Sequence, residues 1–374
     1  MLTKQERLIL ICNEVLFGAK SVQKGLFQFT ASELEEVCDY AQGHGLMVIL
    51  ASSFDQIDTS EEETTDLQDT KIGYFLLAKD IKAQYRDMKE SAIMLARMLQ
   101  DNGLDVMFMK GATLAQFYPK KSWRNCSDID CYLYGRQQEV FEVLRKAQVD
   151  VYDTHMYHGH AELKDVSIEL HQQFLEVGEV RTNAVVQEAL ASLAETEGRK
   201  YPSQWLPEDI HRAYDMTPTM NAIFLLRHMS KHFVWETVLL RQLYDWGLFL
   251  KHQGHLVNWQ RVEQVYEEAG MTDFARRILA IVTDRMKMPV GDCCPLTPLD
   301  DQWTELMWQT IYSIAELSPF YKIPIIRGFY RRSEFLRNKW RFHITYSRDS
   351  YWRTWWYVFL RAFKTIYKDS IQKF

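Results

Sequence analysis

The sequence lacks the cysteine spacing of a zinc ribbon or a redox motif. None of its six cysteines forms a CxxC pair, and the adjacent Cys293 and Cys294 suit neither an ordinary disulfide nor a zinc site. We therefore interpret the cysteines as reduced thiols, which is typical of a cytoplasmic protein.

Long hydrophobic runs are missing as well. No stretch approaches the roughly 18 apolar residues that a membrane-spanning helix needs. The N-terminal apolar stretch contains Glu14 and follows Glu6 and Arg7, which is not the layout of a signal peptide. Hydrophobic residues make up 47% and charged residues 25% of the chain, as in ordinary globular proteins. We therefore expect a cytoplasmic protein.

Basic residues are outnumbered by acidic residues in most of the chain and are concentrated at its end. Residues 321–374 contain 13 Lys/Arg and 3 Asp/Glu, while the remainder has 31 basic and 47 acidic residues. This basic tail also carries many aromatic residues, among them Trp355, Trp356, Val358, Phe359 and Phe363 as an apolar cluster. Three hypotheses fit it: packing on the acidic body or a partner, lying on an anionic membrane surface, and binding single-stranded nucleic acid. We favour the first, and the nucleic-acid signal is the weakest.

Helical patterns occupy both flanks of the chain. Capping boxes at Thr30/Glu33 or Ser32/Glu35 open a helix that runs to about Gln42. An acidic loop over 55–66 precedes a long helix over 69–102, which Gly103 ends. The later helices are predicted over 182–196, 217–233, 234–253, 259–268, 272–286 and 299–317.

The middle of the chain has a different pattern, with short apolar runs of strand length. These predict strands over 106–109, 130–134, 150–152, 160–163 and 166–171, with helices over 111–118 and 137–147. The predicted fold class is α+β, with a small mixed-sheet core flanked by helical regions. The expected organisation is an N-terminal helical region (1–103), the core (104–175), a C-terminal helical region (176–320) and the basic tail (321–374).

Three carboxylates stand out in this core. Asp128 and Asp130 are two residues apart, so they project to the same face if they lie on a strand. Glu169 lies between Ile168 and Leu170 on another predicted strand. Three carboxylates on one face repel one another unless a divalent cation lies among them, and Mg²⁺ or Mn²⁺ suits such oxygen ligands.

Lys110 and Gly111 lie where the first predicted strand ends and a helix begins. Glycine at this corner lets the backbone approach a phosphate, and Thr113 adds a hydroxyl. Lys110 and Arg124 could neutralise a triphosphate.

Residues 105–171 resemble the polymerase-β-type nucleotidyltransferase superfamily, and more closely a bacterial family of uncharacterised nucleotidyltransferases. The resemblance rests on MFMKGATLAQFY, Arg124, SDIDCYLY and VSIELHQQF, and extends into LLRHMSKHF and LLRQLYDWGLFL. It implies a transferase that moves a nucleoside monophosphate from an NTP, with ATP as the expected donor, to an unidentified acceptor. Asp128, Asp130 and Glu169 would be catalytic and bind the metal. The nucleotide would be bound by Lys110, Gly111, Thr113, Arg124, Ser127, His228 and Arg241. The chain departs from the superfamily at one place, since Lys-Gly replaces its usual Gly-Ser.

Each of these residues also has a purely structural interpretation. Asp128 and Asp130 could be exposed turn residues, Glu169 could face solvent on an edge strand, and Lys110 could simply be solvated. Arg124 could form a structural ion pair with Asp128.

The later helices carry further candidates with structural alternatives. His228 and His232 have a spacing compatible with zinc, but no third ligand is evident, so helix packing or nucleotide contact is favoured. Arg241 and Asp245 are most simply an ion pair one helical turn apart. His171 could line the site or pack in the core.

Three functional hypotheses follow. The leading one is a metal-dependent nucleotidyltransferase whose acceptor bears a hydroxyl group. The alternative is a catalytically inactive nucleotidyltransferase fold that acts as a binding module, which the Lys-Gly departure motivates. A third hypothesis assigns the main role to the basic tail on a surface.

Overall fold

A six-stranded mixed sheet forms the centre of the computed structural model, which describes residues 2–23, 25–57, 64–152, 158–177, 180–313, 336–357 and 359–360. In spatial order its strands are β3 (Val151–Tyr152), β4 (His158–Leu163), β5 (Val166–His171), β2 (Asp128–Tyr132), β1 (Val106–Met109) and β6 (Ala213–Asp215). The β2 strand is parallel to β5 and antiparallel to β1. With the helices around it, this sheet confirms the predicted α+β class.

The alternation of side chains gives the sheet two different faces. Phe108, Ile129 and Ile168 belong to an apolar face, which is buried together with residues of α4 (Thr64–Asp101) and α6 (Gln137–Lys146). Met107 and Met109 point to the opposite face, whose core cluster includes the C-terminal helices. This second face is the polar face, because it also carries the acidic residues of β2 and β5.

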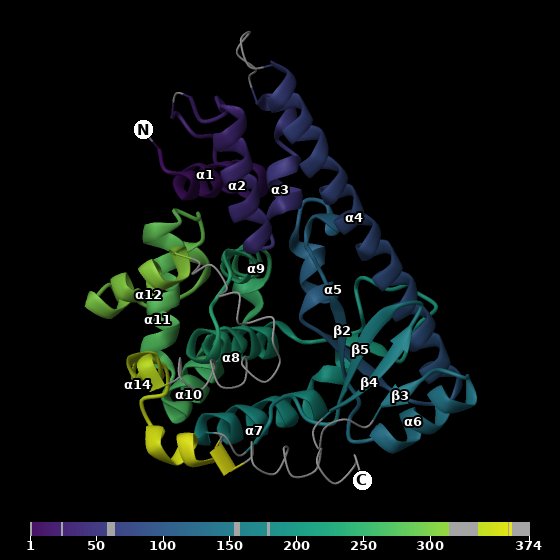
Figure 1. Cartoon of the computed structure of the whole chain (residues 1–374). Helices are drawn as coiled ribbons and strands as arrows, with labels where there is room; N and C mark the ends of the chain where they lie inside the picture. Colours follow the sequence, from purple (N-terminus) through teal and green to yellow (C-terminus); the bar gives the residue numbers. More distant parts are fainter. Residues whose placement is uncertain are drawn as a thin grey trace.

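The long helix α4 joins the N-terminal helices to the sheet. Its N-terminal half contacts α2 (Ala31–Gly43) and α3 (Met47–Ala51), and it also contacts the sheet and α6. In Figure 1 it runs in dark blue along one edge of the molecule, from the group of α1 (Lys4–Phe17), α2 and α3 down to α6. The predicted capping box of Thr30 and Glu33 opens α2, and Gly103 follows α4 with a φ of 70°. Of the predicted loop 55–66, residues 58–63 lie outside the described part.

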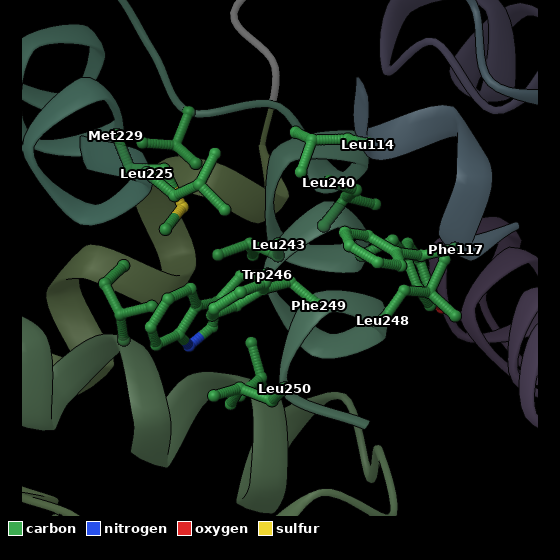
Figure 2. Packing of buried hydrophobic residues seen from close by; sticks show 14 of the residues in the cluster. Leu114, Phe117, Leu225, Met229, Leu240, Leu243, Trp246, Leu248, Phe249 and Leu250 are labelled. Carbon is green, nitrogen blue, oxygen red and sulfur yellow. The ribbon is translucent and has the colours of Figure 1, made fainter. Parts of the chain in front are cut away.

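The C-terminal helices cover the polar face from the other side of the molecule. They are α7 (Arg181–Thr196), α8 (Pro218–Trp235), α9 (Leu240–Gln253), α10 (Trp259–Ala269), α11 (Thr272–Ala280), α12 (Gln302–Tyr312) and α14 (Lys339–Thr345). Figure 2 shows part of the packing of α9: the ring of Phe249 lies 6.2 Å from that of Phe117, which follows the short helix α5 (Gly111–Leu114), and 5.5 Å from that of Trp246. Burying each such ring contributes roughly 1.5–3 kcal/mol, so this packing stabilises the position of α9.

Several predicted boundaries were wrong. Strand β2 begins at Asp128 rather than 130 and ends before Tyr134, whose φ is 50°. The helix predicted from 234 begins at Leu240, because the Gln242 side chain accepts a hydrogen bond from the Leu239 N–H and caps a new start. Helix α12 begins after Asp301, which caps it, and residues 314–317 of that prediction lie outside the described part. The three-residue strand β6 was not predicted.

The described part of the basic tail packs on the body. Phe342, Tyr346 and Tyr351 are buried against Val180 and Val234, while Trp352 and Trp356 are exposed. Val358 and Phe363 lie outside the described residues. Within the ranges given above, no helix has both the length and the apolar character that crossing a membrane requires. The six cysteines are all free thiols.

Candidate active site

An acidic cluster forms where β2 and β5 run side by side on the polar face. Asp130 lies directly opposite Glu169 in the strand register, and His171 follows Glu169 on the same face of β5. The His171 Nε2 atom lies 3.1 Å from Asp130 Oδ1 and 3.2 Å from Glu169 Oε2. One ligand atom from each of the three residues lies within 4.8 Å of the others. This set of two carboxylates and one imidazole has the chemistry of a divalent-cation site.

Lys110 closes this cluster from the end of β1. Its ammonium donates a hydrogen bond of 2.6 Å to Asp130 Oδ1, and Asp130 is only 3% exposed. The Lys110 backbone has φ 50° and ψ −124°, which L-residues rarely adopt and which costs on the order of 1–3 kcal/mol. The sharp turn aims the side chain back across β2 before α5 begins at Gly111.

The pKa values of the cluster follow from these contacts. Burial opposes ionisation of Asp130, but Lys110 and His171 outweigh it and hold the pKa of the carboxyl well below its usual range. The hydrogen bond from His171 likewise lowers the pKa of Glu169. Burial lowers the pKa of His171, yet the two carboxylates more than compensate and raise it above its ordinary value. Both carboxylates are therefore ionised at neutral pH.

Asp128 shares the face but not the cluster. Its carboxylate accepts a hydrogen bond of 3.1 Å from Ser127 Oγ. Burial, followed by the nearby charge of Asp130, raises its pKa. A cation beside Asp128 would relieve this repulsion.

Arg124 has a different partner from the one predicted. Its guanidinium forms two hydrogen bonds of 2.8 Å to the two oxygens of Asp245 on α9, and Tyr118 donates a third of 2.8 Å. The alternative ion pair of Arg124 with Asp128 does not form, and the predicted ion pair between Arg241 and Asp245 was wrong. Arg241 instead donates to the backbone carbonyl of Asn125. The cause is tertiary packing, since α9 brings Asp245 to the loop before β2 and spacing along one helix cannot show this.

The two histidines of α8 contact each other, with their Nε2 atoms 3.1 Å apart. His232 Nδ1 also lies 3.0 Å from Glu236 Oε2. Burial, together with the positive charge of Lys110, holds the pKa of His228 well below its ordinary value, so His228 is neutral. Across the described ranges, the group of three ligands that could hold a metal is Asp130, Glu169 and His171, and it does not include this pair.

Every predicted site residue except Thr113 lines one cavity of about 550 Å³. This volume is in the range of small-molecule sites. Leu114, Leu225 and Met229, which Figure 2 shows above α9, supply part of its apolar wall. Thr113 is buried, and its hydroxyl donates 2.9 Å to the Lys110 carbonyl, so it braces the turn instead of facing the cavity.

Two residues near the site were not singled out from the sequence as site residues. Lys231 lines the cavity, and Arg227 lies one helical turn before it on α8. The sequence feature that could have identified Arg227 is its charge inside the apolar run IFLLRHM. Such a residue needs a buried polar environment.

Comparison with known protein families identifies the family of this chain. Residues 31–287 match the family described as uncharacterised nucleotidyltransferase. The chain belongs to this family. The match extends from α2 to beyond α11, so it includes the sheet and both walls of the cavity. Comparison with curated proteins and with solved structures finds no match. The predicted resemblance to an uncharacterised nucleotidyltransferase family is confirmed, and membership supports nucleotidyl transfer as the class of function.

Proposed function

We propose that this nucleotidyltransferase-family protein is a metal-dependent enzyme that transfers a nucleoside monophosphate from an NTP to a hydroxyl-bearing acceptor. One observation carries the proposal: Asp128, Asp130 and Glu169 face the same cavity as Lys110 and Arg241. Carboxylates and basic side chains that line one cavity suit a nucleotide whose phosphates are bound through a metal.

The residues present fit a divalent cation. Asp130, Glu169 and His171 offer converging ligand atoms, and Asp128 is a fourth donor on the same face. Mg²⁺ or Mn²⁺ bound there would neutralise charge on the phosphates and polarise the phosphorus under attack. Asp130 is ionised and therefore able to bind a cation. Lys110, which contacts Asp130 beside His171, has a flexible side chain that can turn from the carboxylate to a phosphate oxygen.

The proposed reaction is a displacement at the α-phosphorus of the NTP. The acceptor oxygen forms a bond to the α-phosphorus, and the bond from this phosphorus to the bridging oxygen breaks, so pyrophosphate leaves with that oxygen. The acceptor proton passes to Glu169, the carboxylate that is more exposed than Asp130, acting as general base. Lys110 and Arg241 would bind phosphates, with Gly111, Ser127 and His228 forming the wall of the nucleotide site. ATP is the expected donor.

The experiment is an assay of pyrophosphate release and of labelled NMP transfer with Mg²⁺ or Mn²⁺. The Asp128→Asn/Asp130→Asn double variant is compared with Asp150→Asn, which makes the same change at an exposed position. The proposal predicts metal-dependent activity that the double variant loses and Asp150→Asn keeps. Undiminished activity in the double variant would contradict it.

A catalytically inactive binding module is the second candidate, and the contact between Lys110 and Asp130 favours it. This ammonium occupies a carboxylate oxygen that a metal would need, and Lys-Gly stands where the superfamily has Gly-Ser. Calorimetry with ATP, GTP, CTP and UTP in the presence of Mg²⁺ separates the candidates. Failure of all four to bind would favour the inactive scaffold.

A further inference from the structure

A second, smaller cavity lies beside the acidic cluster and adjoins the proposed nucleotide cavity. It measures about 190 Å³ and shares Lys110, Glu169, His228 and Lys231 with the larger cavity. Its own walls come from the segment after β5, from α7 and from α8, and include Gln173, Asn183, Phe224 and Arg227. Glu169 and Lys110 therefore border both cavities, so a ligand in one cavity would lie next to a ligand in the other at these two residues.

Arg227 is the unusual residue of this second cavity. It is 1% exposed, and its guanidinium donates to Asn183 Oδ1 and, over 3.2 Å, to Ser230 Oγ. Tyr346 lies 5.3 Å away as an aromatic neighbour. All of these partners are neutral, and among the described residues Arg227 forms no ion pair with a carboxylate, although Glu176 lines the same cavity. They also leave part of the five-donor guanidinium without an acceptor among those residues.

Two other buried arginines show what this protein does when the role is structural. Arg124 is paired with Asp245 and Arg277 with Asp301, each at 2.8 Å. A buried guanidinium without a counter-ion is costly. The charge of Arg227 therefore calls for an anion that enters the cavity from outside.

Gln173 adds an independent observation at the same place. Its Oε1 atom is buried and has no hydrogen-bond partner among the described residues, although buried polar atoms are normally paired. A carbonyl oxygen accepts from a donor such as a hydroxyl. The cavity thus presents an unpaired cation and an unpaired acceptor.

We propose that this cavity binds the acceptor substrate, and that the acceptor is a small compound carrying an anionic group, phosphate or carboxylate, together with hydroxyl groups. Arg227 binds the anionic group, and Gln173 accepts a hydrogen bond from one hydroxyl. A second hydroxyl reaches Glu169, which borders both cavities. The volume is equivalent to about six water molecules at ~30 Å³ each, which fits a compound of a few carbon atoms with one phosphate. The inference rests on the proposed function, since it names the acceptor of that reaction.

The test uses calorimetry on the full-length protein with Mg²⁺, and three probes: inorganic phosphate, glycerol 3-phosphate and glycerate. The two organic probes distinguish phosphate from carboxylate as the anion. Gln173→Glu is nearly isosteric and adds a negative charge to the cavity, where it would pair with Arg227. Gln172→Glu makes the same change on the exposed neighbouring side chain and is the matched control.

We expect at least one probe to bind and Gln173→Glu to weaken it about tenfold to a hundredfold, the range for losing a charge-assisted hydrogen bond. Gln172→Glu keeps the affinity, and ATP binds equally well to both variants. Arg227→Gln repeats the loss, with Arg277→Gln as its control.

The proposal is overturned if no probe binds the wild-type protein, or if Gln173→Glu binds the probes as well as Gln172→Glu. It is also overturned if Gln173→Glu weakens ATP as much as the probes, because the cavity would then belong to the nucleotide. A wild-type protein that binds a probe but no NTP would leave the anion site intact and refute the nucleotidyltransferase proposal instead.

Discussion

The two faces of the central sheet are built from the same strands but serve opposite purposes. On the apolar face, Phe108, Ile129 and Ile168 are fully or almost fully buried under α4 and α6. On the polar face, the adjacent positions carry Asp128, Asp130 and Glu169 beside a cavity. One face therefore stabilises the fold by excluding water, while the other keeps charged groups close together.

The buried apolar face explains how a small sheet tolerates such a charged cluster. Charges at this density destabilise a fold unless they are paired, and Lys110 and His171 pair only some of them. The apolar face and the helices α8 and α9 hold the strands in register, so the cluster persists without having to stabilise the sheet. Changes on the two faces should consequently have separable effects on activity and on stability.

The largest expected effect is on activity, from the polar face. Asp130→Asn should lower NMP transfer about 100- to 10,000-fold, the range for a group that acts directly at the reacting centre. The rate is measured at saturating NTP and metal, with circular dichroism to verify folding. A folded variant with wild-type activity would place the chemistry elsewhere.

Substitutions on the apolar face should lower the free energy of unfolding and leave NTP binding intact. Phe108→Ala removes a buried ring that packs edge-on against Trp205 at 5.3 Å, and should cost about 3–5 kcal/mol in the free energy of unfolding. Urea denaturation measures the loss, and NTP affinity is measured well below the midpoint. A fall in NTP affinity without a fall in stability would break the proposed separation of the faces.

One carboxylate, that of Asp215, lies on the apolar side of the sheet and allows the two faces to be compared by their pH dependence. Asp215 on β6 accepts a hydrogen bond from Trp205 Nε1 at 3.1 Å, and burial raises its pKa to about 6. Because the folded pKa is above the unfolded value, its contribution to stability is present at low pH and is lost as pH rises from about 4 to about 6. The loss amounts to roughly 3 kcal/mol at most.

Asp215→Asn should remove this pH dependence. The free energy of unfolding is compared between wild type and variant at pH 4 and pH 7, and the stability difference should shift in favour of the variant at the higher pH. A difference that is the same at both pH values would show that Asp215 does not titrate in this way.

The smallest effect concerns Thr113, which was predicted to bind nucleotide but lies buried. Thr113→Val removes its hydrogen bond to the Lys110 carbonyl and should cost about 1 kcal/mol of stability, leaving NTP affinity nearly unchanged. Thr196→Val, an exposed threonine with a similar backbone bond, is the control. If Thr113→Val abolished NTP binding at full stability, its hydroxyl would be a ligand after all.

Local pattern predicted the longer strands of the sheet but not the short edge strand β6. Strand β1 was predicted with its observed bounds, because a short apolar run between turn residues is a local signal. Strand β6 was missed, since three residues have no periodicity and pair only through tertiary contact.

The partners of the site residues depend on folding at long range. Asp128, Asp130 and Glu169 could be singled out by their strand spacing. The pairing of Arg124 with Asp245, 121 positions along the chain, could not. The contact of His171 with both carboxylates required the register of β2 against β5, which no local pattern specifies.

The most direct test of the central claim is a structure of the protein with Mn²⁺ and a non-hydrolysable NTP analogue. We expect a metal bound by Asp130 and Glu169 and the α-phosphate in the 550 Å³ cavity. We also expect Lys110 to have moved from Asp130 to a phosphate oxygen. A nucleotide bound away from the polar face, or a cavity still closed by Lys110 on Asp130 at saturating ligand, would contradict it.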